Sequence, residues 1–408
     1  MTKQIHSGIA AGQVPEGYKL EHGYVIPKEW KVVHFNECFH RLTQKNIENN
    51  QNVLTISAQQ GLISQLDYYN TLYASEDKTG YFLLQKGDFA YNKSYSADYA
   101  YGAIKQLEKY DKGIVSPLYI CFSANEGTNT DFYRQYFEAG MFNREIYKIA
   151  QEGARNHGLL NVSTPEFFSA VLVFPPVEEQ KKIAEVLSCC NRVIELKQQL
   201  IAEMQRLKSG FLQAMFPAKG HSEPDIRFPE FSGDWEQRKL GELCNITTGK
   251  LDANAMVSDG QYDFYTSGID VFKIDVAAFE GPAITIAGNG ASVGYMHLAD
   301  GKFNAYQRTY VLTDFLADRQ FLNVAIGNEL PDKIQEEVRG SGIPYIVLNM
   351  LTDLAIPFPS HEEQYAIGVY FQQLDKLITL HQRELEETKK KKKSLAKLLL
   401  TGSVRVPT

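Results

Sequence analysis

Two stretches of the chain carry mainly apolar residues at alternating steps of four and three. The first stretch gives Ile183, Leu187, Cys190, Ile194, Lys197, Ile201, Met204, Lys208, Phe211 and Met215. The second stretch gives Ile367, Phe371, Leu374, Ile378, His381, Leu385, Thr388, Lys392, Leu395 and Leu399. A mean spacing of about 3.5 residues is typical of a coiled-coil seam. The pattern predicts two long helices, each roughly 60 Å in length at about 1.5 Å per residue.

The two predicted helices repeat one pattern at a shift of 184 positions. The shift places Lys197 on His381 and Lys208 on Lys392, so even the polar interruptions of the two seams coincide. Helices whose seams match in this way are expected to pack on each other. Together they predict a paired helical spacer.

Each predicted helix follows the same junction, which reads FPPVEEQ at 174–180 and FPSHEEQ at 358–364. Proline ends the preceding strand, and the acidic residues then lie in the first helical turn, where the positive end of the helix dipole favours carboxylates. We therefore interpret Glu178, Glu179, Glu362 and Glu363 as residues that start helices, and not as catalytic acids.

The segments before the two helices also repeat, but more loosely. A shift of 205 aligns Trp30 with Trp235 and superimposes WKVVHFNECFHRLTQK on WEQRKLGELCNITTGK. Stretches rich in β-branched and aromatic residues between turn residues predict strands within 86–96, 114–122, 280–294 and 303–312. A helical pattern occupies 131–150. Each segment is expected to be a mixed globular domain in which helices pack on a sheet.

The predicted fold class is α/β (α+β), with two globular domains that are each followed by a long helix. The predicted divisions are a globular domain at 1–175, a long helix at 176–216, a linker at 217–234, a second globular domain at 235–359, and a second long helix with a C-terminal tail at 360–408. The linker PAKGHSEPDIRFPEFSGD is rich in proline, glycine and charge, as is typical of a domain boundary.

With this duplicated layout, the sequence resembles the specificity subunits of Type I restriction–modification systems. The resemblance is carried by FPPVEEQKKIAEVLS, FPSHEEQYAIGVYFQ, the entry FPEFSGDWEQRKLGEL to the second globular domain, and the two long helices. It covers essentially the whole chain, and the duplicated layout is more specific than any single motif.

The resemblance implies two target recognition domains, each of which reads one half of a split target in double-stranded DNA. It implies that the long helices pair as an antiparallel coiled coil with pseudo-twofold symmetry and set the distance between the halves. The partners it implies are DNA adenine methyltransferase (modification) subunits, two of them if each repeat docks one, and restriction or translocase subunits.

The composition fits a globular protein and excludes several classes. The chain has 408 residues, of which 44% are hydrophobic, but no apolar run approaches the roughly 18–20 residues of a membrane span. The first residues show no apolar core of a secretory signal, so we expect a cytoplasmic protein. Five cysteines without a CxxC pair indicate neither a disulfide framework nor a zinc ribbon.

The net charge of −7 is unusual for a protein expected to bind DNA. Residues 235–355 hold 9 Lys and Arg against 16 Asp and Glu, and residues 25–172 hold 14 against 16. We therefore expect the chain alone to bind DNA weakly, with methyltransferase subunits sharing the phosphate contacts. The KKKKK run at 389–393 is either a solvated helix face near the negative end of the dipole, or a contact for phosphate or an acidic partner.

Polar residues in predicted loops are the candidates for base reading, because their donors and acceptors match those of base edges. In the first domain they are Arg41, Thr43, Gln44, Lys45, Asn92, Lys93, Ser94, Tyr95, Arg155, Asn156 and His157. In the second domain they are Thr247, Thr248, Lys250, Asn289, Ser292, Tyr306, Gln307, Arg308, Arg339 and Ser341. For any one of them, an ordinary solvated or turn-capping role is an open alternative.

No motif for catalysis, a cofactor or a metal is complete. The stretch IAGNGASVG at 286–294 imitates a dinucleotide fingerprint, but turn signals follow it where a helix is needed. His34, Cys38 and His40 lack a second cluster of metal ligands. The sequence has no GxxxxGK[ST] loop and no Asn-Pro-Pro-Tyr type tetrapeptide. We expect a non-catalytic DNA-recognition subunit that needs no cofactor.

Other functions stay open. The chain could serve a fused methyltransferase–nuclease, which the gene neighbourhood would reveal. It could be a coiled-coil scaffold whose globular domains bind proteins or sugars, in which case it would not co-purify with a methyltransferase. An enzyme acting in a pocket of either domain would require a cluster of acid, base or nucleophile that the sequence does not display.

Overall fold

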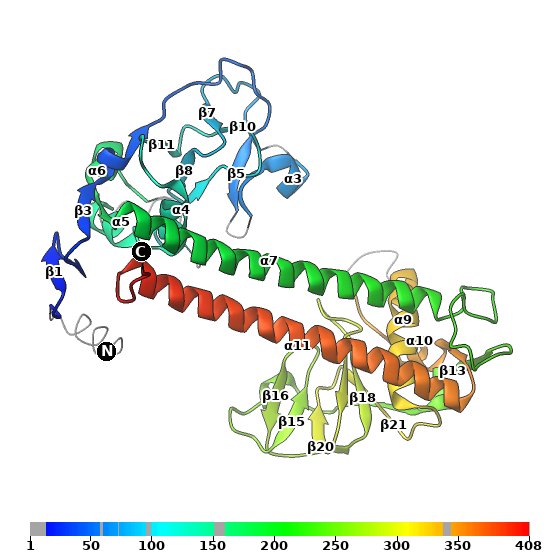
Figure 1. Cartoon of the computed structure of the whole chain (residues 1–408). Coiled ribbons are helices and arrows are strands. Elements are labelled where there is room, and N and C mark those ends of the chain that lie inside the picture. Colours follow the sequence, from blue (N-terminus) through cyan, green and yellow to red (C-terminus); the bar gives the residue numbers. More distant parts are fainter. Residues whose placement is uncertain are drawn as a thin grey trace. The chain divides into compact units, whose positions relative to one another are not determined.

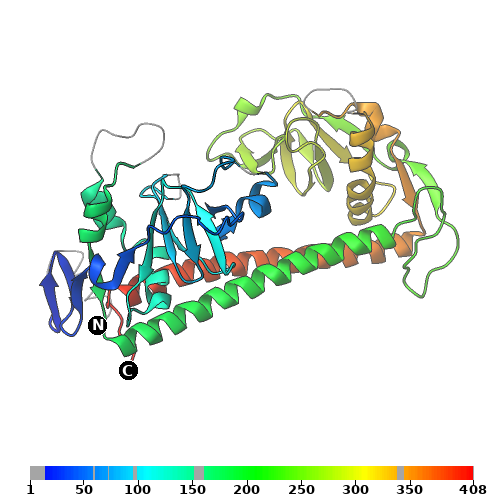
Figure 2. The ribbon, with the colours of Figure 1, turned by 90° about the horizontal axis from the view of Figure 1, so that it is seen from above.

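The computed structural model describes residues 14–57, 60–71, 73–94, 99–150, 160–337 and 344–407. The chain divides into unit 1, which comprises residues 1–196 and 386–408, and unit 2, which comprises residues 197–385 (Figures 1 and 2). The divisions fall inside the two long helices, α7 (Val177–Ala214) and α11 (His361–Leu400). Each unit therefore joins a globular part to one portion of each long helix, and the five-part division predicted from the sequence stays a prediction.

Unit 1 is built on a four-stranded antiparallel sheet in the order β4-β11-β8-β9. These strands are β4 (Phe39–Arg41), β8 (Phe89–Asn92), β9 (Ala103–Gln106) and β11 (Ile120–Ala124). Four two-stranded pairs accompany the sheet, namely β1 (Tyr18–Glu21) with β2 (Tyr24–Pro27), β3 (Lys31–His34) with β12 (Val171–Phe174), β5 (Leu54–Ser57) with β6 (Gly61–Ser64), and β7 (Phe82–Gln85) with β10 (Lys112–Val115).

Short helices and aromatic rings complete unit 1. The helices are α2 (Phe35–Cys38), α3 (Gln65–Tyr69), α4 (Thr130–Glu138), α5 (Asn143–Ile149) and α6 (Thr164–Ser169). The helical pattern predicted at 131–150 is split into α4 and α5, because the chain turns at Gly140 with a φ of 71°. Phe35, Phe39, Phe89 and Phe122 are fully buried and pack ring against ring at the centre of the core.

Unit 2 contains two four-stranded sheets and one strand pair. The first sheet has the order β14-β21-β18-β19, with β14 (Asn245–Thr248), β18 (Ala283–Ala287), β19 (Met296–Ala299) and β21 (Thr309–Thr313). The second has the order β16-β15-β20-β17, with β15 (Tyr262–Tyr265), β16 (Val271–Ile274), β17 (Phe279–Glu280) and β20 (Lys302–Ala305). The strand pair joins β13 (Glu236–Lys239) to β22 (Ala355–Phe358), and the helices are α8 (Leu240–Leu243), η2 (Ala253–Ala255), α9 (Arg319–Glu337) and α10 (Leu348–Thr352).

The two units share one plan, which explains the repeat in the sequence. The strand order β4-β11-β8-β9 of unit 1 corresponds to β14-β21-β18-β19 of unit 2. Val171 pairs with His34 in unit 1, and Ala355 pairs with Lys239 in unit 2, at the shifts of 184 and 205 already seen in the sequence. The regions predicted as strands contain β8 and β18 and overlap β10, β11, β20 and β21, so strands are confirmed in all four regions.

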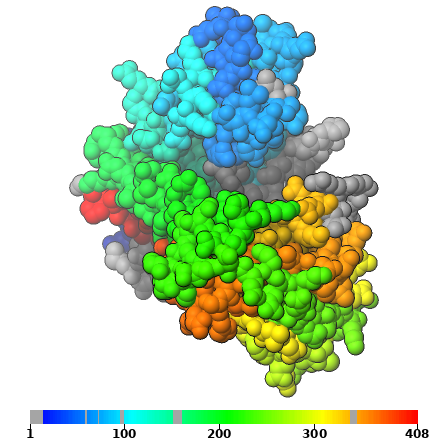
Figure 3. All heavy atoms as spheres, turned by 90° about the vertical axis from the view of Figure 1, so that its right-hand side faces the viewer, coloured from blue at the N-terminus to red at the C-terminus, as the bar shows by residue number. Residues whose placement is uncertain are grey.

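The predicted seams are also confirmed, because every seam position in both helices is buried or half-buried. In unit 1 the beginning of α7 packs on the end of α11, and Ile183, Leu187 and Leu399 share one core. In unit 2 the end of α7 packs on the beginning of α11, and Met215 and Phe371 share another (Figure 3). In each unit the two helices therefore run antiparallel.

A buried ion pair anchors the start of α7 in unit 1. Glu179 has no exposed surface and accepts hydrogen bonds from Arg405 Nε at 2.6 Å, Arg405 Nη2 at 2.8 Å and Trp30 Nε1 at 2.8 Å. These hydrogen bonds raise the pKa of Arg405 above its ordinary value. The neighbouring Glu178 is exposed and pairs only with Lys181 one turn along the helix. The interpretation as a helix-start residue thus suffices for Glu178, whereas Glu179 also joins three separate segments.

Unit 2 repeats this arrangement with residues of its own. Arg227 donates from Nε and Nη2 to the two carboxylate oxygens of Glu363, both at 2.8 Å, and Glu363 is 1% exposed. Arg227 belongs to the segment predicted as a linker, which is therefore docked on unit 2. Trp235, at the position that corresponds to Trp30, buries its Nε1 without a partner among the described residues.

The polar interruptions of the seams are partly paired. Lys197 Nζ donates to Glu384 at 2.8 Å, and Lys208 Nζ donates to Asp375 at 2.6 Å. Lys392 is the counterpart of Lys208 at the shift of 184, and burial lowers its pKa. The counterpart of Asp375 at the same shift is Asn191, so unit 1 has an amide at this position, and the carboxylate that acts on Lys392 is that of Glu138.

Glu363→Gln should destabilise unit 2 by about 3 kcal/mol, because it leaves the largely buried Arg227 without a full counter-charge. The adjacent Glu362→Gln is the matched control, since that side chain is exposed. Calorimetric unfolding of the full chain measures both variants. Equal melting temperatures for the two would contradict the role assigned to the buried pair.

Asn191→Asp should stabilise unit 1 by about 0.5–1 kcal/mol, because the new carboxylate would face the partly buried ammonium of Lys392. The stabilisation should be present at neutral pH and be lost as the pH falls through the lowered pKa of the new aspartate. Gln199→Glu adds the same charge at an exposed position of α7 and is the control. A melting temperature of Asn191→Asp no higher than that of Gln199→Glu would refute the pairing.

Candidate nucleic-acid interface

Three strand ends meet at one edge of the first sheet of unit 2, which we call edge 2. Thr248 at the end of β14 pairs with Tyr310, and Ala287 at the end of β18 pairs with Thr309, so both strands end beside the start of β21. The structure brings together at this edge the predicted residues Thr247, Thr248, Lys250, Asn289, Tyr306, Gln307 and Arg308. Ser292 lies farther along, in the turn between β18 and β19.

Neighbouring side chains orient the two amides of edge 2. Ser267 Oγ donates to Asn289 Oδ1 at 2.6 Å, and Gln307 Nε2 donates to Asp252 Oδ1 at 2.7 Å. An amide carries both donors and acceptors, so each side chain keeps hydrogen-bonding capacity beyond these contacts. Gln307 is exposed and Asn289 is half-buried. Edge 2 therefore holds its two amides in fixed orientations with hydrogen-bonding capacity left over.

Glycines permit the close backbone approach that forms edge 2. A Cβ atom on Gly249 would lie 1.9 Å from the carbonyl oxygen of Ala305, and one on Gly288 would lie 2.3 Å from that of Arg308. Gly288 N donates to Arg308 O at 2.9 Å, and Gly249 N donates to Thr309 O at 3.2 Å. The loop after each strand is thus held against the turn at 306–308, which only glycine allows.

Unit 1 gathers its candidates in the same way, at an edge that we call edge 1. Arg41 ends β4 and Asn92 ends β8, and both strands flank the start of β11. Asn92 Nδ2 donates to the hydroxyl of Tyr119, just before β11, at 3.4 Å. Edge 1 brings together Arg41, Thr43, Gln44, Lys45, Asn92, Lys93 and Ser94.

The candidates at edge 1 differ in how far contacts within their own domain hold their side chains. Arg41, Thr43 and Gln44 are exposed. Lys45 Nζ lies 3.9 Å from the centre of the Phe82 ring and donates to Gly80 O at 2.7 Å, so its charge is partly held by its own domain. Asn92 Oδ1 accepts from Ser94 N at 3.0 Å, which fixes the turn that follows β8.

The register shows which residues of the two edges correspond. Lys45 corresponds to Lys250 at the shift of 205, and the strand pairings place Ser94 at the position of Asn289. Leu160 N donates to Lys93 O at 2.9 Å in unit 1, and Ile346 N donates to Gly288 O at 2.7 Å in unit 2. The edges are therefore two versions of one construction with different side chains.

Six predicted residues lie outside the described part of the chain. They are Tyr95, Arg155, Asn156, His157, Arg339 and Ser341. The described residues that follow His157 and Ser341 in the sequence do reach the edges. Leu160 contacts Lys93, and Gly290 N donates to Pro344 O at 3.3 Å. Because these contacts lie next to the predicted residues in the sequence, the predicted residues stay candidates.

The side chains behind the edges show no metal or catalytic arrangement. His34 and His40 contact Ser169 O and Asn125 Oδ1, and burial raises the pKa of the Cys38 thiol. Burial lowers the pKa of His297, whose Nε2 has no partner among the described residues. The described ranges contain no group of three or more His, Cys, Asp or Glu placed to hold a metal. Among the same ranges, none of the helices has the length and apolar composition of a membrane span.

Comparisons with known proteins point to one family. Residues 232–390 match the family model of the Type I restriction modification DNA specificity domain. The chain is 40% identical over 166 residues to the Type I restriction enzyme EcoDI specificity subunit of Escherichia coli, a match that spans 41% of this chain and 35% of that relative. It is 24% identical over 431 residues to the Type I restriction enzyme MjaVIII specificity subunit of Methanocaldococcus jannaschii, with 96% of each chain covered.

Solved structures agree on the fold. The S subunit of a Type I restriction-modification system from M. genitalium has a TM-score of 0.58 at 16% identity, covering 93% of this chain and 97% of that one. A chain from a study of complex assembly and conformational transition of the type I R-M system has a TM-score of 0.56 at 17% identity, covering 93% and 100%. These matches confirm the resemblance to the specificity subunits of Type I restriction–modification systems.

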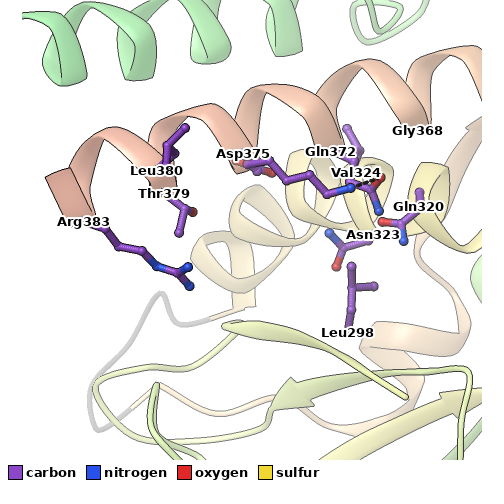
Figure 4. A pocket seen from close by; sticks show the side chains of 11 residues that line it. Leu298, Gln320, Asn323, Val324, Gly368, Gln372, Asp375, Thr379, Leu380 and Arg383 are labelled. Carbon is purple, nitrogen blue, oxygen red and sulfur yellow. Dashed lines mark hydrogen bonds between the residues drawn. The ribbon is translucent and has the colours of Figure 1, made fainter. Parts of the chain in front are cut away.

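Unit 2 also has a groove of about 500 Å³ between α11, α9 and β19 (Figure 4). Polar side chains that include Asn323, Thr379 and Arg383 line it. Its acid, Asp375, is engaged by Lys208, and Lys376 Nζ donates to Gln372 at 3.0 Å. The side chains of Asp375 and Lys376 are therefore each engaged by another residue.

Sequence reasoning missed two residues that shape the edges. Ser267 orients Asn289, and Tyr119 contacts Asn92. Both come from other loops, 22 and 27 positions away from their partners. Their polar side chains next to predicted strands were a usable signal, but only the strand order reveals which loops meet.

Gly249→Ala should destabilise unit 2 by more than about 2 kcal/mol, because the new methyl group would overlap the carbonyl of Ala305. Gly268→Ala is the matched control at a neighbouring loop, where the nearest atom would lie 3.6 Å from the added Cβ. Thermal unfolding of both variants checks this. If Gly249→Ala and Gly268→Ala had the same melting temperature, edge 2 would not depend on the close approach of the backbone at Gly249.

Proposed function

We propose that the chain is the non-catalytic, sequence-specifying subunit of a Type I restriction–modification complex and recognises a bipartite DNA target. Edge 1 reads one part of the target and edge 2 reads the other. The observation that carries the proposal is the repetition of one edge construction in two units, each with a different set of polar side chains. Two similar frames with different side chains suit two different half-sites.

The side chains of the edges match the chemistry of base recognition. Asparagine and glutamine amides can form paired hydrogen bonds with adenine, and arginine can do so with guanine. Asn289, Gln307 and Arg308 offer both kinds of contact at edge 2, and Asn92 and Arg41 offer both at edge 1. Lys45 and Lys250 occupy corresponding positions and are suited to phosphate contacts on the two parts of the target.

The partners in this proposal are methyltransferase subunits and restriction subunits. Residues 235–355 have seven more acidic than basic residues, so their own electrostatic attraction to DNA is unfavourable. A methyltransferase that encloses the duplex would provide the missing phosphate contacts as well as the chemistry. The paired helices α7 and α11 are the docking elements that we assign to these subunits.

A fused methyltransferase–nuclease remains the alternative partner, because the same two-edge construction would serve it equally. A scaffold that binds proteins or sugars is less well supported, since it does not account for amides and cations gathered at both edges. Co-purification identifies the partner in either case.

Deleting the gene should abolish adenine methylation at one split motif of the host genome, read by single-molecule sequencing. Complementation with Asn92→Ala should relax one half of that motif only, and Asn289→Ala the other half only, because each lost amide contact removes about 1–3 kcal/mol of discrimination. Wild-type complementation is the control.

Two results would contradict the proposal. One is a methylome that stays unchanged on deletion although the chain co-purifies with an active methyltransferase. The other is a change in both halves of the motif from a single edge variant. If no methyltransferase co-purifies, the scaffold function gains support.

A further inference from the structure

Three exposed tyrosines form a cluster beside edge 1. Tyr68, Tyr69 and Tyr73 are 46%, 45% and 72% exposed. The rings of Tyr68 and Tyr69 lie 4.6 Å apart between centres, and those of Tyr69 and Tyr73 lie 5.1 Å apart, both edge to face. Within the described part of the chain, none of the three hydroxyls donates a hydrogen bond to another residue. We call these residues the tyrosine cluster.

The cluster sits on a well-anchored support. Gln65 N, at the start of α3, donates to Val53 O at 2.8 Å, and Tyr110 OH donates to Asp67 Oδ2 at 2.5 Å. Asn70 ends the helix with a φ of 54°, and Gln65 Oε1 accepts from Tyr73 N at 3.0 Å. The rings are therefore exposed on a helix and a turn that hydrogen bonds hold in place. Exposed aromatic rings gathered on a fixed support commonly mark a binding surface.

The support is an addition specific to unit 1. Arg41 and Tyr91 are 50 positions apart, whereas their counterparts Ile246 and Ile286 are 40 positions apart, so unit 1 carries ten extra residues between these strands. Residues 246–286 are all described, and they contain the short 3₁₀-helix η2 but no α-helix. A shared structural role in both units would not require α3.

One half-buried tyrosine connects edge 1 with the strands that support the cluster. Tyr119 contacts Asn92 through its hydroxyl and packs on the core cluster that holds Leu54 of β5 and Leu62 of β6. Strand β5 pairs with β6, and α3 follows β6 directly. The exposed rings therefore lie next to the side chains that we assign to base reading.

We propose that the tyrosine cluster binds the sugar–phosphate backbone of the DNA next to the bases read by edge 1. This inference rests on the proposed function. Tyrosine hydroxyls donate hydrogen bonds to phosphate oxygens, and the rings cover the sugars. Residues 25–172 hold 14 basic against 16 acidic residues, so their net charge does not attract phosphate. Uncharged donors can fix the backbone without them.

The uncharged character of the contact gives it a distinctive signature. A cation that binds phosphate releases a counterion, and its loss changes the salt dependence of affinity. A tyrosine hydroxyl releases none. A backbone contact also carries no sequence information of its own.

The test is the variant Tyr68→Phe/Tyr69→Phe/Tyr73→Phe in the complex reconstituted with its methyltransferase subunits. The probes are a duplex with the methylated motif and a scrambled duplex of the same composition. We expect affinity for both duplexes to fall roughly tenfold to hundredfold, from the loss of up to three hydrogen bonds to a charged acceptor. The slope of log affinity against log salt should not change, and the methylated motif should stay the same.

Tyr147→Phe is the matched control, since Tyr147 is 63% exposed but lies on α5, to which no binding role is assigned. It should leave DNA affinity unchanged. Unfolding temperature and co-elution with the methyltransferase establish that the triple variant is folded and assembled.

Wild-type affinity in the triple variant would overturn the inference, and so would a loss of assembly with the methyltransferase at unchanged DNA affinity. A change restricted to the target duplex would overturn it as well, because the cluster would then read bases. A wild-type complex with no preference for the target duplex would instead refute the proposed function. The wild-type measurement thus separates the two failures.

Discussion

The architecture of each unit depends on one buried carboxylate at the start of a long helix. Glu179 binds Arg405 and Trp30, so it joins the first turn of α7 to the segment after α11 and to the entry of the first globular part. Glu363 binds Arg227 in the same manner in unit 2. A buried carboxylate is tolerated only when charge and hydrogen bonds compensate it, so these contacts fix which segments meet. The strand pairs β3–β12 and β13–β22 then connect these anchored helix starts to the sheets and their edges.

The features predicted correctly from the sequence are those with a local period. The spacing of apolar residues specified both long helices, and runs of β-branched and aromatic residues specified the main strands. The role of the second glutamate in each junction was missed, because its arginine lies 226 positions away in unit 1 and 136 positions away in unit 2. The single helical pattern at 131–150 was divided by Gly140, whose conformational freedom outweighs the apolar period around it.

The candidate site was predictable in part for a similar reason. Polar residues at the ends of strands could be identified, and the strand order brings most of them to two edges. The orienting residues Ser267 and Tyr119 could not be, because their contacts depend on which loops the sheet places side by side. The tyrosine cluster was equally hidden. A short run of tyrosines in a sequence fits a hydrophobic core as well as a surface, and only the burial of each ring distinguishes the two.

The edges separate the parts that form the scaffold from the parts that meet a ligand. At edge 2 the backbone contacts of Gly249 and Gly288 set the loop positions, whereas the side chains of Gln307 and Arg308 are exposed. Side chains that do not support the frame can differ between the two units at little cost in stability. Under the proposed function, recognition then has two components. Amides and cations at the edges select bases, while uncharged backbone contacts and the partner subunits supply affinity, which an acidic chain cannot provide through its own charge.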